Sequence, residues 1–113
     1  MISRALLRKD KQIGLRLNDD EYLKISLLAK YHSLTKSSYI GELIKDFSSS
    51  LEHNIPRGKR EKQISVRLSE NDFQSLDSKA RKEGVSQQNY IRMVIHSISL
   101  PHNIDNKIVI KTK

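Results

Sequence analysis

An internal repeat limits the folds open to this chain of 113 residues more than any other feature of its sequence. Residues 11–47 align without a gap on residues 62–98. Nine aligned positions are identical, and in the first copy these are Lys11, Gln12, Ile13, Arg16, Leu17, Ala29, Tyr39, Ile40 and Ile44. Because a regular internal period marks one supersecondary unit that is used again, the sequence predicts two copies of a single unit.

Each copy has the pattern of a strand followed by two helices. The segments QIGLRL and QISVRL alternate polar and apolar residues, which is the period of a half-buried strand. Each helix is preceded by a residue suited to an N-cap, and these are Asn18, Thr35, Ser69 and Ser86. Gly84 predicts a left-handed end to the first helix of the second copy. Ser33 holds the matching place in the first copy and predicts a weaker stop.

One copy alone can neither pair its strand nor cover its apolar face, whereas two copies together do both. We predict that the strands pair antiparallel and that four helices pack beneath them, a mainly α fold with a short β ribbon. Antiparallel pairing sets Gln12 near Arg67, Gly14 opposite Ser65, and Arg16 near Gln63. The predicted segments are a basic arm 1–10, unit one 11–49, a basic linker 50–61, unit two 62–99 and a tail 100–113, with both units in one globular domain.

This order of elements resembles the ribbon-helix-helix, or Arc/MetJ-type, DNA-binding family. The run QISVRLSENDFQSLDSKARKEGVSQQNYIRMVI carries the resemblance most fully. The first copy departs from the pattern at Gly14 and at Ser33, where the loop glycine is missing. Most members of the family pair two separate chains, so two units in one chain resemble the TraY-type relaxosome accessory proteins of conjugative plasmids.

The resemblance implies that the outward face of the ribbon reads bases in the major groove of duplex DNA. The alternation places six residues on that face, namely Gln12, Gly14, Arg16, Gln63, Ser65 and Arg67. Arg can bond guanine bidentately and Gln can bond adenine in the same way. Since Gly14 has no side chain, we expect the first copy to read with fewer atoms and the bound site to be asymmetric.

The second helices are expected to bind phosphate, because the first amides of a helix lack intrahelical partners and favour an anion. The residues concerned are Thr35, Lys36, Ser37, Ser86, Gln87 and Gln88. The net charge of +8 also favours an anionic partner. Cations in the arm and linker are expected to add non-specific phosphate contacts, and these are Arg4, Arg8, Lys9, Arg57, Lys59 and Arg60.

Other classes of function fit the sequence less well. The chain has no Cys, its four His show no metal-ligand spacing, and no phosphate-binding Gly loop or nucleophile motif occurs, so we expect neither an enzyme nor a cofactor. The absence of Cys fits a reducing cytoplasm, the start of the sequence lacks the apolar run of a secretory signal, and no apolar run is long enough to cross a bilayer, so we expect a cytoplasmic protein. The predicted function is transcriptional repression, plasmid transfer beside a relaxase, or both; the alternative is an antitoxin that also binds its operator.

Three leucines of the first copy exceed the apolar pattern of the repeat. Leu23, Leu27 and Leu28 stand where the second copy has polar residues. Either the N-terminal arm covers them, or they contact a neighbouring copy of the protein on DNA. The tail NKIVIKTK alternates weakly, which leaves both a short strand and a disordered segment open.

Overall fold

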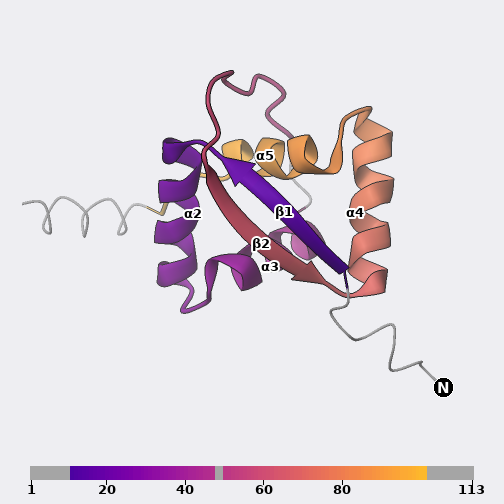
Figure 1. Ribbon diagram of the computed structural model, residues 1–113, viewed down its shortest axis with the longest axis horizontal. Helices are drawn as coiled ribbons and strands as arrows, with labels where there is room; N and C mark the ends of the chain where they lie inside the picture. Colours follow the sequence, from indigo (N-terminus) through magenta and orange to yellow (C-terminus); the bar gives the residue numbers. More distant parts are fainter. Residues whose placement is uncertain (1–10, 48–49, 102–113) are drawn as a thin grey trace, which may run out of the picture.

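The computed structural model describes residues 11–47 and 50–101 of the chain. In chain order the elements are β1 (Lys11–Leu17), α2 (Asp19–Tyr31), α3 (Lys36–Asp46), β2 (Lys62–Leu68), α4 (Glu70–Glu83) and α5 (Gln87–Ser97). Figure 1 shows the two strands side by side in front, α2 and α4 on either flank, and α3 and α5 crossing behind. The fold class predicted from the repeat, four helices with a two-stranded antiparallel ribbon, is confirmed.

The two strands pair in the register that the repeat predicts. Gly14 stands opposite Ser65, and this central pair marks a pseudo-twofold axis between the units. The matched pairs Gln12 with Arg67 and Arg16 with Gln63 flank it. Along each strand every second side chain is buried, so one face of the ribbon is core and the other is open.

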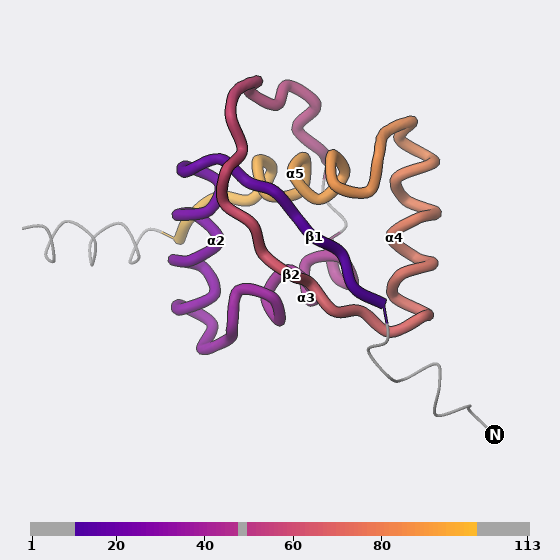
Figure 2. The backbone as a smooth tube through the Cα atoms, viewed as in Figure 1, coloured from indigo at the N-terminus to yellow at the C-terminus, as the bar shows by residue number. Residues whose placement is uncertain are grey.

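A single apolar core lies between the ribbon and the helices. The ribbon contributes Ile13, Leu15, Leu17, Ile64, Val66 and Leu68. Each second helix lies beside the strand of the other unit, α3 beside β2 and α5 beside β1, so neither unit has a core of its own. The tube in Figure 2 shows this exchange, with the strand of one unit passing over the second helix of the other.

The predicted N-caps are all in place. Asn18 Oδ1 accepts a hydrogen bond from the Glu21 amide at 2.7 Å, and Glu21 Oε1 accepts from the Asn18 amide at 2.8 Å, a complete capping box. The hydroxyl of Ser69 accepts from the Asp72 amide at 3.1 Å. These bonds satisfy amides that a helix start leaves without partners, and they fix where each strand turns into its helix.

The two first helices end in the same left-handed turn, made by a different residue in each unit. Gly84 ends α4 with φ 71°, a left-handed conformation that glycine adopts without a Cβ clash. Ser33 takes φ 58° after α2, although a residue with a side chain is strained there. The same turn is therefore made in both units, at a higher conformational cost in the first.

The three surplus leucines have separate environments. Leu28 is buried in the core, Leu27 is partly buried, and Leu23 is 57% exposed. In the second unit Lys79 replaces Leu28 and donates from Nζ to the carbonyl oxygen of Ile44 at 2.8 Å, near the end of α3. The arm expected to cover the leucines lies outside the described residues, as do the strand and disorder predicted for the tail.

Three further features of the described residues bear on the sequence analysis. Between Ser50 and Glu61 the structure has no helix or strand, in keeping with the predicted linker. In the part of the chain that the structure describes, no helix is long and apolar enough to cross a membrane. Nor do residues 11–47 and 50–101 hold a cluster of three side chains that could bind a metal ion.

Candidate nucleic-acid interface

The open face of the ribbon gathers the six residues predicted to read bases. All six are exposed, in two rows that the antiparallel register places side by side. The side chain of Gln63 extends over Gly14. A Cβ built on Gly14 would lie only 3.1 Å from Gln63 Nε2. Gly14 therefore leaves room for a long side chain of the other strand, and the face is asymmetric at its centre.

Cations stand at both ends of this face. Lys11 Nζ lies 3.3 Å from Glu70 Oε1 and 5.6 Å from the centre of the Phe73 ring. At the pseudo-equivalent place Lys62 Nζ lies 5.7 Å from the centre of the Tyr22 ring. Lysine stems packed on aromatic rings keep their ammonium groups at the surface, and that of Lys11 is paired there with the Glu70 carboxylate.

The first turns of α3 and α5 are capped in the same way. Thr35 Oγ1 accepts from the Ser38 amide, and Ser86 Oγ accepts from the Asn89 amide, both at 3.1 Å. Each hydroxyl satisfies the third amide of its helix, so the two amides before it have no intrahelical partner and can meet an anion.

The side chains of these first turns are not equivalent. In α3, Lys36 Nζ lies 5.3 Å from the centre of the Tyr22 ring and adds a charge that α5 lacks. In α5, Gln87 Nε2 donates to Asp77 Oδ1 at 3.3 Å, and Gln88 is bonded to β1. At the start of α5, the side chains of Gln87 and Gln88 therefore have partners inside the protein, and the backbone amides of the first turn are the groups left to meet an anion.

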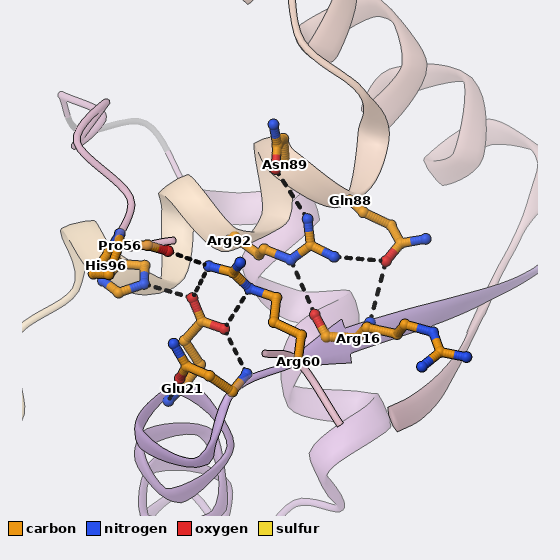
Figure 3. A network of polar contacts seen from close by, with 9 residues as sticks. Arg16, Glu21, Pro56, Arg60, Gln88, Asn89, Arg92 and His96 are labelled. Carbon is orange, nitrogen blue, oxygen red and sulfur yellow. Dashed lines mark hydrogen bonds and ion pairs between the residues drawn. The ribbon is translucent and has the colours of Figure 1, made fainter. Parts of the chain in front are cut away.

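Arg92 of α5 contacts the ribbon, which the strand and helix patterns of the sequence do not indicate. Its Nε donates to the carbonyl oxygen of Arg16 at 2.9 Å, while Gln88 Oε1 accepts from the Arg16 amide at 3.1 Å (Figure 3). Burial, reinforced by the like charge of Arg60 and opposed by Glu21, lowers the pKa of Arg92. The repeat contains one indication of this contact. Arg92 aligns with Gly41 of the first copy, so the second copy has a long cationic side chain where the first copy has none.

Arg60 does not occupy the position expected of a free linker cation. Its guanidinium donates to both carboxylate oxygens of Glu21, at 3.1 and 3.0 Å, and to the carbonyl oxygen of Pro56 at 2.9 Å. Its side chain is only 16% exposed, so the expected phosphate contact is replaced by an internal ion pair. Arg57 and Lys59 are exposed, and Arg4, Arg8 and Lys9 lie outside the described residues.

Glu21 is the buried centre of this ion pair. Its side chain is fully buried, and His96 Nε2 lies 2.6 Å from its Oε2 atom, beside the bonds from Arg60 (Figure 3). Burial alone would raise the pKa of Glu21, but hydrogen bonds from Arg60, Asn18 and His96, with the charge of Arg60, lower it below the ordinary value. The linker is thus tied to the start of α2 and to the end of α5.

One comparison with known proteins gives a match. Residues 58–112 match the model of the NikA-like family, described as mobilization protein NikA. The match begins in the linker and takes in β2, α4 and α5, the unit whose sequence follows the ribbon-helix-helix pattern more fully. No curated protein and no solved structure matches the chain.

Proposed function

We propose that this chain is a sequence-specific binder of double-stranded DNA that inserts its antiparallel ribbon into the major groove. The observation that carries the proposal is the exposed face of the ribbon, on which Arg16 stands opposite Gln63 and Arg67 stands opposite Gln12 in the strand register. A two-stranded ribbon fits the major groove, where every base pair presents a distinct set of donors and acceptors. An Arg and a Gln on each half can select guanine and adenine, each contact contributing about 1–3 kcal/mol of discrimination.

Phosphate contacts orient the ribbon on the duplex. The free amides at the starts of α3 and α5, with Lys36, hold the backbone on either side of the groove, and such contacts carry no sequence information. Arg57 and Lys59 add attraction that weakens as salt is raised. The binding free energy is then divided between a salt-sensitive part from the flanks and a base-specific part from the ribbon.

The biological role that we propose is plasmid mobilization. The match of residues 58–112 to a mobilization protein family supports a relaxosome accessory factor, a non-enzymatic protein that binds near an origin of transfer and assists a relaxase. A protein that occupies such a site can also repress a promoter beside it. Further copies on adjacent sites, and residence on plasmid DNA in the cytoplasm, belong to the same proposal.

Selection of bound sequences from a random duplex pool tests the proposal. The wild-type protein should select a short, imperfectly symmetric site, since its two reading strands differ at Gly14 and Ser65. Arg16→Ala should relax the preference in one half, by about tenfold at the base pair affected, and Arg67→Ala should relax it in the other half. Arg81→Ala, which removes an exposed Arg from α4, is the control and should leave the selected site unchanged. If neither ribbon variant changes the preference, the ribbon is not the reader.

A further inference from the structure

Two side chains of α5 hydrogen-bond to the backbone of Arg16 at the outer edge of β1. The amide of Arg16 donates to Gln88 Oε1 at 3.1 Å, and the carbonyl oxygen of Arg16 accepts from Arg92 Nε at 2.9 Å. Both polar groups of this peptide edge point away from β2 and would otherwise be left to water. The side chain of Arg16 itself is exposed on the reading face (Figure 3).

The two holding side chains also fix each other. Arg92 Nη2 donates to Gln88 Oε1 at 2.9 Å, and Arg92 Nη1 donates to Asn89 Oδ1 at 2.9 Å. Residues three and four apart on a helix are neighbours, so Gln88, Asn89 and Arg92 form one preassembled surface on α5. Three of the five donors of the Arg92 guanidinium are hydrogen-bonded, so the group has little rotational freedom left. Its hydrogen bond to the Arg16 carbonyl oxygen therefore has a fixed direction.

In the other half of the ribbon, the described residues do not hold Arg67 in this way. In the aligned repeat, Ser37 and Gly41 of α3 stand where α5 has Gln88 and Arg92. A Cβ built on Gly41 would lie 4.0 Å from Leu68 Cδ2, so the helix backbone itself approaches β2 there. Within residues 11–47 and 50–101, no side chain hydrogen-bonds to the backbone of Arg67.

We propose that Gln88 and Arg92 are positioning residues that fix the direction in which Arg16 leaves the strand and so sharpen base discrimination in one half of the bound site. The inference rests on the proposed function and goes beyond it by assigning unequal specificity to the two halves. A bidentate contact to guanine requires the guanidinium to be held within a narrow range of positions, and supporting hydrogen bonds provide this. The half read by Arg16 and Gln63 is then the stricter one, and the half read by Arg67 and Gln12 tolerates more sequences.

The experiment measures binding of single base-pair variants of the selected site to the wild type and to Arg92→Lys. Lysine keeps the charge but cannot bond Arg16, Gln88 and Asn89 at once. Discrimination at the base pair read by Arg16 should fall by roughly threefold, less than with Arg16→Ala, while discrimination at the base pair read by Arg67 stays the same. Gln88→Ala should also lower discrimination at the base pair read by Arg16. If Arg92→Lys does not fold, the same measurement is made with Gln88→Ala.

Two results would overturn the inference. One is an equal loss of discrimination in both halves, which would mean that Arg92 supports the fold in general. The other is a uniform loss of affinity with all preferences kept, which would make Arg92 a phosphate contact. Arg81→Lys, the same change on an exposed part of α4, is the matched control and should alter nothing. Failure of the proposed function is recognised separately, because Arg16→Ala would then leave the preference unchanged as well.

Discussion

The two second helices lie under the same ribbon but meet it in different ways. α3 approaches β2 at Gly41, next to the Leu68 side chain, whereas α5 reaches β1 through the side chains of Gln88 and Arg92. A homodimer must present the same contacts twice, because its interface follows the symmetry axis. Two units in one chain do not have that requirement. In this chain α3 and α5 contact the ribbon through different groups.

The starts of the two first helices show the same divergence. Glu21 in α2 is fully buried and bonded to Arg60 and His96, whereas its counterpart Asp72 in α4 is only partly buried. The difference arises because the linker runs past α2 and α5, and it brings Arg60 to Glu21. The linker therefore does more than join the units: it supplies the partner that lets one of them bury a carboxylate.

The largest effect is expected from breaking this linker contact. Arg60→Ala leaves the buried carboxylate of Glu21 with fewer partners and should lower the free energy of unfolding by about 3 kcal/mol. Urea denaturation followed by circular dichroism measures the change. Arg57→Ala, an exposed Arg of the same linker, is the control and should cost less than about 0.5 kcal/mol. Equal costs for the two variants would contradict the structural role of Arg60.

The pH dependence of stability should reveal the same carboxylate. Because the folded pKa of Glu21 is lowered from its ordinary 4.5, its contribution is present above that value and is lost as the pH falls through the lowered folded pKa. The stability advantage of the wild type over Glu21→Gln should therefore shrink as the pH is lowered from about 7 to about 3. Denaturation curves at several pH values measure it, and a difference that stays constant would show that the charge of Glu21 stabilises nothing.

The turns after the first helices give a smaller contrast. Gly84→Ala forces a Cβ into a left-handed conformation and should destabilise the protein by about 1 kcal/mol. Ser33→Gly relieves the same strain in the first unit and should stabilise it by about 0.5 kcal/mol, after the entropic cost of glycine. Thermal melting compares the two. Opposite signs are expected, and destabilisation by both would show that the Ser33 side chain has a role of its own.

The smallest expected effect concerns Gly41. Alanine favours a helix over glycine, and a Cβ there would meet Leu68 Cδ2 at an ordinary contact distance of 4.0 Å. Gly41→Ala should therefore stabilise the protein by about 0.5 kcal/mol, as measured by urea denaturation. A clear loss of stability would mean that α3 needs a still closer approach to β2, and it would make the contrast with α5 stronger.

Much of the fold could be predicted because the features that determine it are local or repeated. Strict alternation gives the two faces of each strand, and caps such as Asn18 act on amides within three residues. The register follows from the repeat, since two like strands that pair antiparallel must cross at a central pair, here Gly14 with Ser65. The outward position of the candidate reading residues follows from the same alternation.

The contacts that make the two units differ, those of Arg60 and Arg92, could not be predicted from local patterns or from the repeat. Arg60 bonds a residue 39 positions away and Arg92 bonds one 76 positions away, and no periodicity links them. A cation in a linker has the same sequence pattern whether it is free or paired, so the sequence alone predicts a phosphate contact for Arg60. The structure was needed to show which long side chains remain available to a partner.

The central claim is that Arg16 and Arg67 bond guanine in the major groove, and replacing that guanine with 7-deazaguanine tests it most directly. The substitution removes the N7 acceptor from the major groove and leaves the minor groove unchanged. The wild type should lose affinity by about tenfold at the guanine read by Arg67, and Arg67→Ala should show no further loss from the same substitution. Equal losses for wild type and variant, or no loss in either, would contradict the claim.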